Sequence, residues 1–136
     1  MGSTEMIILD THSVVWWIKT PLKLSAKAKK EILKAQKEKE IFISSISAWE
    51  IALLVKEGKL NLGIEVSQWV EKLARNSAIH FIPVDNEIAI KSVNLVDFTN
   101  KDPADRIIVA TAKHLGAKLI TSDRRILKYK GVQAVW

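Results

Sequence analysis

Short apolar runs alternate along the chain with longer segments in which apolar residues recur at helical spacing. The runs predict buried strands at 7–9, 41–43, 79–82 and 118–121, and a short fifth strand at 132–135. The segments between them predict helices at 14–18, 25–37, 45–57, 66–74, 85–95 and 103–115. Because strands and helices alternate, we expect a mainly parallel sheet with helices on both faces.

The predicted fold class is therefore α/β, a three-layer α/β/α sandwich around a central, mainly parallel sheet of four to five strands. A length of 136 residues fits a single domain spanning 1–136, with residues 1–5 as a polar, disordered leader. No apolar run approaches the roughly 20 residues of a membrane span, and no secretory signal is recognisable. The chain contains no cysteine, which excludes disulfides and thiolate sites. We therefore expect a cytoplasmic protein with no membrane partner.

The net charge of +6 changes this picture, because a basic surface favours polyanions and above all nucleic acid. Ordinary solubility explains the same charge equally well. Five lysines on the second predicted helix either contact phosphate or form a solvated face, and the sequence does not decide between these roles: Lys27, Lys29, Lys30, Lys34 and Lys37.

Acidic residues follow two of the predicted strands. Asp10 comes directly after the first strand, and Asp123 lies just past the fourth. In an open parallel sheet the functional crevice lies beyond the carboxyl ends of the strands, so both residues stand where chemistry is expected. Each also precedes a helix, and capping is the commoner use of an aspartate in such a position.

Glu50 is the more informative acid, because the segment 48–55 around it is otherwise apolar. We expect this helix to be buried on most sides, where a carboxylate is costly unless a cation or hydrogen-bond donors satisfy it. A structural ion pair with a lysine or arginine is the alternative. A functional role is favoured.

Two further acids open the helix at Pro103. Asp102 fits the cap position and Pro103 the first helical position, so capping explains Asp102 well. It explains Asp105 less well, because the apolar run 107–109 follows at once, and the start of a buried helix can direct an acid into the crevice.

Several carboxylates that converge without enough basic partners repel one another, and a divalent cation removes that repulsion. Oxygen ligands of this kind suit Mg²⁺ or Mn²⁺. Such ions activate water and stabilise the charge that develops on a phosphate during in-line displacement. The acids therefore predict a metal-dependent site that acts on a phosphate polymer.

Four segments resemble, in order and spacing, the characteristic motifs of PIN domains, and most closely those of VapC-like toxins: 8–12, 47–51, 102–106 and 119–123. The resemblance extends from Met6 to Trp136. It implies a Mg²⁺- or Mn²⁺-dependent endoribonuclease, a homodimer, and a partner antitoxin that covers the active site. It also implies a catalytic and metal-binding quartet with three accessory residues: Asp10, Glu50, Asp105 and Asp123, with Asp102, Thr11 and Thr121.

Tryptophans lie near two of these acids. Trp16 and Trp17 follow Asp10 shortly along the chain, and Trp49 precedes Glu50. They could stack on bases, as aromatic residues do in proteins that bind single strands. Burial in the core or in a dimer interface is the preferred interpretation.

Other functions remain open alongside an RNA-cleaving toxin. A PIN nuclease of RNA processing, or one that cleaves DNA, would carry the same acids. A phosphoacceptor module would place its acceptor aspartate after the third strand, where this chain has Pro83 and Val84. A non-catalytic interaction module would leave Glu50 without a purpose.

Overall fold

The computed structural model describes residues 6–136, and the leader predicted at 1–5 lies outside the described residues. Five parallel strands form one sheet in the order β3-β2-β1-β4-β5. Their bounds are β1 (Ile7–Leu9), β2 (Ile41–Ser44), β3 (Ile79–Ile82), β4 (Lys118–Ile120) and β5 (Ala134–Val135). The predicted parallel α/β fold is confirmed.

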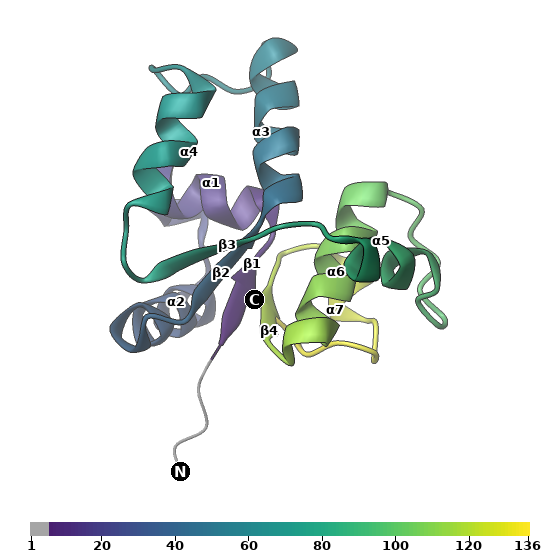
Figure 1. Cartoon of the computed structure of the whole chain (residues 1–136). Coiled ribbons are helices and arrows are strands. Elements are labelled where there is room, and N and C mark those ends of the chain that lie inside the picture. The colour runs from purple at the N-terminus through teal and green to yellow at the C-terminus, as the bar shows by residue number, and fades with distance from the viewer. Residues whose placement is uncertain (1–5) are drawn as a thin grey trace.

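Seven α-helices and one short 3-10 helix connect these strands among the described residues. Their bounds are α1 (Thr11–Lys19), η1 (Pro21–Lys23), α2 (Ala26–Glu38), α3 (Ser45–Lys56), α4 (Val66–Ala74), α5 (Asn86–Val93), α6 (Pro103–Leu115) and α7 (Arg124–Leu127). Figure 1 shows α5, α6 and α7 grouped on one side of the sheet and α2 on the other. None of the helices in this part of the chain is both long and apolar enough to cross a bilayer.

The central strand β1 is buried on both faces, which explains why all three of its residues are apolar. Ile7 and Leu9 pack into a core with residues of α1, α2, α3 and α4. Ile8 points to the opposite face and packs with residues of α6 and α7. Alternate residues of one strand thus hold the two outer layers together.

One helix end follows the predicted capping signal and another differs from it. Gly116, in the left-handed conformation at φ 66°, caps α6, a role that suits a residue without a Cβ. α3 begins differently from the prediction: Ser44, rather than Ser45 or Ser47, caps it by accepting a hydrogen bond from the Ile46 amide at 3.1 Å. The strand β2 therefore runs directly into α3, and the chain needs no loop there.

The strand order places a switch point between β1 and β4. From β1 the chain proceeds to β2 on one side, whereas β4 and β5 extend the sheet on the other side. At such a point the connections leave in opposite directions and open a crevice at the carboxyl ends of the strands. Asp10 follows β1, and Asp123 lies beyond β4, so the topology brings these two acids to the edges of one crevice.

Candidate active site

The predicted acids surround one cavity of about 390 Å³ at this switch point. The structure brings together the whole predicted quartet, and it adds Asp102 and Thr11 to the same walls. The lining residues are Asp10, Thr11, His12, Trp16, Glu50, Asp102, Asp105, Ser122, Asp123 and Arg125. Thr121 does not line the cavity, but it contacts an acid that does.

Asp10 is buried, and each of its two carboxylate oxygens accepts one hydrogen bond. Its Oδ1 accepts from the Ser13 amide at 3.0 Å, which caps α1. Its Oδ2 accepts from the Thr121 hydroxyl at 2.5 Å, and that hydroxyl oxygen also accepts from the Asp123 amide at 3.1 Å. Asp10 therefore caps α1 and also lines the cleft. The Thr121 hydroxyl links Asp10 to Asp123 at the switch point.

Glu50 reaches the cleft from α3. Its carboxylate accepts a hydrogen bond from the Thr11 hydroxyl, which lies 3.0 Å from the Ser47 hydroxyl. Partial burial raises the pKa of Glu50, although the hydrogen bond from Thr11 opposes that rise. No lysine or arginine of residues 6–136 forms an ion pair with Glu50, so the structural ion pair considered as an alternative is absent from the described chain.

The prediction that α3 is buried on most sides is wrong. Ser47 and Ile51 are its buried residues, whereas Trp49 is 58% exposed and Leu53 is 38% exposed. An apolar window on a surface helix looks the same in sequence as one in a core. The exposed apolar side chains of α3 instead leave a face open to a partner.

Asp105 is held at the start of α6 by its neighbours. Asp102 caps this helix by accepting from the Asp105 amide at 3.1 Å, as the sequence predicted. The Asn100 side chain then donates to Asp105 Oδ2 at 2.9 Å and accepts from the Asp102 amide at 2.9 Å. Asn100 is buried, so its amide fixes the direction of the Asp105 carboxylate.

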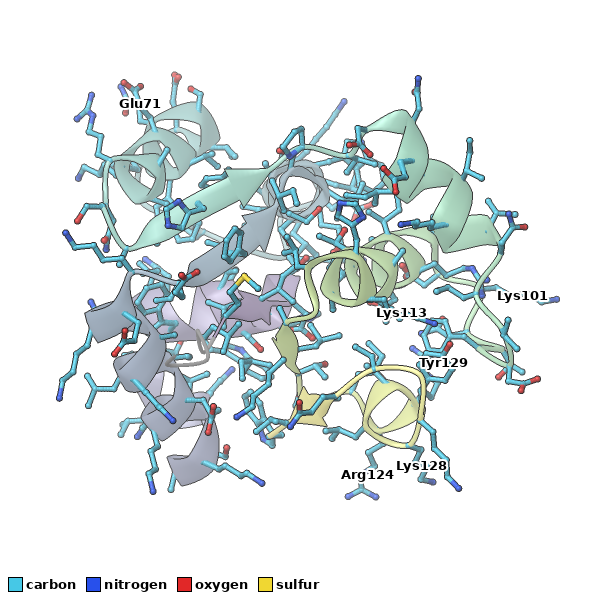
Figure 2. The ribbon with its side chains drawn as sticks, turned by 60° about the horizontal axis from the view of Figure 1, so that its bottom comes forward. Glu71, Lys101, Lys113, Arg124, Lys128 and Tyr129 are labelled. Atoms are coloured by element: carbon cyan, nitrogen blue, oxygen red, sulfur yellow. The ribbon has the colours of Figure 1, made fainter. Side chains whose placement is uncertain are left out.

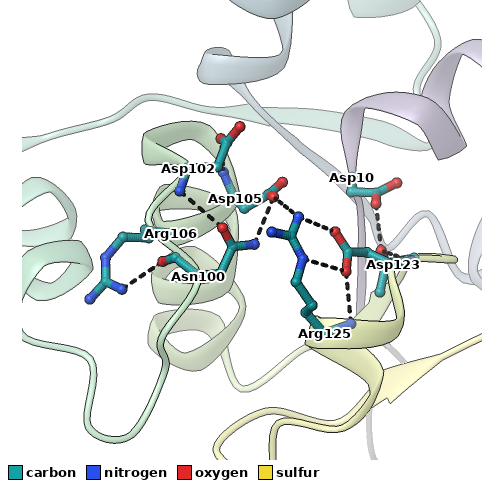
Figure 3. A network of polar contacts seen from close by, with 8 residues as sticks. Asp10, Asn100, Asp102, Asp105, Arg106, Asp123 and Arg125 are labelled. Atoms are coloured by element: carbon teal, nitrogen blue, oxygen red, sulfur yellow. Dashed lines mark hydrogen bonds and ion pairs between the residues drawn. The ribbon is translucent and has the colours of Figure 1, made fainter.

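Arg106 fixes the loop that carries Asn100. Its guanidinium donates to four backbone carbonyl oxygens at 2.8 to 3.2 Å, those of Ser92, Val93, Phe98 and Asn100. Figure 3 shows Arg106 turned away from the cleft and bonded to the Asn100 backbone. Arg106 therefore supports the site from behind and is not a residue of the cleft.

Arg125 is the cation of the cleft. It donates to Asp123 Oδ2 at 3.1 Å and lies 3.7 Å from Asp105 Oδ2, so it stands between these two acids (Figure 3). Partial burial alone would raise the pKa of Asp123, but hydrogen bonds from the Arg125 side chain and backbone outweigh it and lower that pKa. One guanidinium faces five carboxylates here, which leaves a surplus of negative charge.

The surplus of negative charge has a clear effect on the pKa of Asp105. Burial raises its pKa to about 6, and repulsion from Asp102, Asp123 and Glu50 adds to the rise, against the hydrogen bond from Asn100. The folded-state pKa thus lies above the ordinary value of about 4. The contribution of Asp105 to the free energy of unfolding therefore falls as the pH rises from about 4 to about 6.

We expect Asp105→Asn to stabilise the metal-free protein at pH 7 by roughly 1 kcal/mol, after allowance for solvent screening. At pH 4, where the wild-type carboxyl is already protonated in the folded protein, the gain should disappear. Thermal unfolding of both proteins at pH 4 and pH 7 measures this difference. An equal effect at the two pH values would contradict it.

Sequence reasoning missed Asn100, Arg106 and Arg125. Arg125 stands two residues after a predicted site acid, in the helix that Asp123 was expected to cap, and that position was the signal available. Asn100 acts through its side chain, which bonds the Asp105 carboxylate and the Asp102 amide, and Arg106 acts through the backbone carbonyls of residues 92–100. No motif in the sequence marks either set of contacts.

Fold and site together define a parallel α/β protein with an acidic cleft at the switch point of its sheet. Residues 7–132 match the sequence family described as "PIN domain". Ribonuclease VapC22 of Mycobacterium tuberculosis is 33% identical over 124 residues, covering 91% of this chain and 92% of that protein. The chain belongs to the PIN-domain family.

Solved structures share this fold. The VapBC2 complex of Rickettsia felis bound to a promoter DNA fragment contains a chain that matches with a TM-score of 0.71 at 16% identity, covering 96% of this chain and 97% of that one. The DNA-bound VapBC complex of Salmonella typhimurium gives a TM-score of 0.68 at 20% identity, covering 96% of each chain. At these identities the likeness concerns the fold alone.

Proposed function

We propose that this protein is a metal-dependent endoribonuclease that hydrolyses RNA phosphodiester bonds and serves as the toxin of a toxin–antitoxin pair. The observation that carries the proposal is the gathering of five carboxylates and one guanidinium around a single cavity at the sheet's switch point. The relative at 33% identity is named a ribonuclease, which supports RNA as the substrate.

The donor set fits a hard divalent cation such as Mg²⁺ or Mn²⁺ in a partly hydrated form. Within residues 6–136, no three histidine, aspartate or glutamate side chains stand close enough together to hold a metal ion directly. Magnesium keeps several of its waters when it binds proteins, so carboxylates spread around a cavity suit it. Asp10, Glu50, Asp105 and Asp123 would hold it, and the bound ion would activate water and neutralise charge at the phosphate.

The chain's own residues orient this set. The Thr121 hydroxyl holds Asp10, and the Thr11 hydroxyl holds Glu50, so both predicted accessory threonines contact an acid of the quartet. Asp102 stabilises α6 as its cap and lines the same cavity, which makes it a candidate fifth ligand. Arg125 balances part of the acidic charge until substrate and cation arrive.

The proposed partners are an antitoxin protein and a second copy of the chain. Neighbours in structure come from toxin–antitoxin complexes, which supports an antitoxin partner. Large apolar side chains that remain exposed support a homodimer, among them Trp49 on α3 and Ile90 and Val93 on α5. Both proposals agree with the cytoplasmic location expected from the sequence.

Expression in bacterial cells tests the proposed function. Cells that express the wild-type chain without an antitoxin should stop growing and accumulate cleaved RNA, whereas cells that express Asp10→Asn should grow with intact RNA. Growth arrest with intact RNA and broken DNA would favour a DNA nuclease. Normal growth and intact RNA at a verified protein level would count against a toxin.

Metal binding can be measured directly by calorimetry with manganese. We expect weak binding at millimolar concentrations by the wild type and its loss in the double variant Asp10→Asn, Asp123→Asn. Asp85→Asn is the matched control, because Asp85 caps α5 through the Ile88 amide and does not line the cleft. Equal binding by the double variant and the control would contradict this assignment of ligands.

A further inference from the structure

A second cavity, of about 510 Å³, adjoins the acidic cleft along α1. The two cavities share Thr11, His12 and Trp16 as walls, so a chain molecule that leaves the cleft on this side enters the second cavity. The remaining lining residues are Val15, Lys19, Thr20, Lys23, Leu54, Lys59, Leu60 and Asn61.

The charge of this lining is opposite to that of the cleft. It contains three lysines, Lys19, Lys23 and Lys59, and no acidic residue. Lys59 forms an exposed ion pair with Glu57 at 3.4 Å, and exposed pairs of this kind contribute little and exchange readily with solvent. Lys19 and Lys23 form no ion pair with any carboxylate of residues 6–136.

Aromatic rings mark the border between the two cavities. Trp16 is half-buried, and its ring lies 5.7 Å from the ring of His12 and 5.6 Å from that of Trp136, measured between centroids. The Lys23 ammonium stands 5.9 Å from the Trp16 ring. A flat aromatic side chain flanked by lysines is the surface on which proteins stack the bases and bind the phosphates of single strands.

We propose that the second cavity, lined by Lys19, Lys23, Lys59 and Trp16, binds the single-stranded RNA segment that adjoins the scissile phosphate. The inference rests on the proposed function, because the acidic cleft fixes where that phosphate lies. The lysines bind the phosphates of the neighbouring nucleotides, and a base stacks at Trp16. The cleft alone repels RNA, so this basic neighbour supplies the affinity that the acids cannot.

An acidic protein segment would also bind these lysines, so the experiment has to distinguish RNA binding from protein binding. RNA is the occupant that the geometry favours, because the two cavities share walls, so a strand held by a phosphate in the cleft continues directly into the basic cavity on this side. A protein segment has no such requirement to continue into the cleft.

The test compares paired lysine variants in cleavage and in binding. Lys19→Ala, Lys23→Ala should raise KM for a single-stranded RNA about 10-fold or more while kcat changes less than about twofold, because these lysines bind substrate and transition state equally. The slope of log affinity against log salt should become shallower by about 1.4, at roughly 0.7 for each phosphate that the variant no longer neutralises. Lys27→Ala, Lys30→Ala is the matched control: both lysines are exposed on α2 and line neither cavity, so the structure favours the solvated-face interpretation for them over a phosphate contact.

Trp16 provides a second, independent variant. Trp16→Leu should weaken binding of the RNA about 5- to 150-fold, the range expected for one stacked base, and Trp16→Phe should restore most of it. Because Trp16 also packs against the core, each variant is first compared with wild type in thermal unfolding. Restoration by phenylalanine but not by leucine separates stacking from simple filling of space.

Binding is measured by anisotropy of a labelled RNA in the Asp10→Asn background, so the result does not depend on cleavage. If the wild type cuts no RNA, the proposed function fails while this binding result still decides the subsite. The proposed subsite would be overturned if Lys19→Ala, Lys23→Ala matched the α2 control in KM, in RNA affinity and in salt slope. The proposed RNA subsite would also be overturned if the lysine variants kept their RNA affinity but lost affinity for a polyglutamate peptide, since the cavity would then bind protein.

Discussion

Asp10→Asn is expected to reduce RNA cleavage by at least about 100-fold while leaving the fold intact. A metal ligand contributes several kcal/mol to the stabilisation of the transition state, and each 1.4 kcal/mol corresponds to about tenfold in rate. Asparagine caps helices as well as aspartate does, so the hydrogen bond to the Ser13 amide should survive the change. Single-turnover cleavage and circular dichroism on the same preparation measure both effects.

The control for this variant is Asp85→Asn, which makes the same chemical change at the cap of α5, away from the cleft. It should retain wild-type cleavage. If Asp10→Asn also retained it, Asp10 would be only the cap of α1, which is the simpler role that its position after a strand allows. Loss of cleavage together with loss of the folded structure would equally contradict the assignment.

Glu50→Gln should likewise abolish detectable cleavage, and the metal-free protein should be as stable as wild type or slightly more stable. The raised pKa of Glu50 means that its negative charge costs free energy in the folded protein at neutral pH. Glutamine removes that charge and can still accept the hydrogen bond from Thr11. Cleavage and thermal unfolding, both measured on metal-free and manganese-loaded samples, test the two halves of this prediction.

A structural role for Glu50 predicts the reverse outcome. Because no ion pair holds Glu50 in the described chain, such a role would rest on the hydrogen bond from Thr11, and weakening that bond would destabilise the protein by about 1 to 3 kcal/mol, which a thermal melt detects. Glu71→Gln is the control, because Glu71 lies on α4, where it forms an exposed ion pair with Arg75 at 2.8 Å (Figure 2). A large loss of stability in Glu50→Gln, with cleavage reduced only in proportion, would remove Glu50 from the quartet.

Most of the fold follows from apolar runs and capping residues. The predicted strands at 7–9, 41–43, 79–82 and 118–121 agree with the structure to within one residue, because each contains apolar residues that pack into the core. The predicted start of α1 is three residues late. Its first turn is Thr11, His12 and Ser13, whose polar side chains hide the helical period that begins at Val14.

The acids of the cleft are predictable individually but their contacts are not. The sequence indicates that Asp10 and Asp123 lie at strand ends, yet it cannot show that Thr121 joins them, since Thr121 lies 111 residues from Asp10. It also cannot distinguish an exposed apolar face of α3 from a buried one. Three of the acids serve as caps and line the cleft together, so capping and a role in the cleft are not exclusive.

The tryptophans near the site acids differ in burial. Trp16 and Trp17 lie on α1 and pack against the core, in agreement with the preferred interpretation. Trp49 is exposed on α3, where it is available to a partner. Trp16 also borders both cavities, so burial of one side of its ring leaves it able to contact a substrate.

The chemistry of the RNA ends tests the central claim most directly. If the carboxylates of this cleft promote attack by water, wild-type protein with Mn²⁺ should leave a 5′-phosphate and a 3′-hydroxyl, and excess EDTA should stop the reaction. Attack by the ribose 2′-hydroxyl would instead leave a 2′,3′-cyclic phosphate, and it usually depends on acid–base histidines, of which only His12 lines the cleft among residues 6–136. A 2′,3′-cyclic phosphate, or full activity in excess EDTA, would contradict this account.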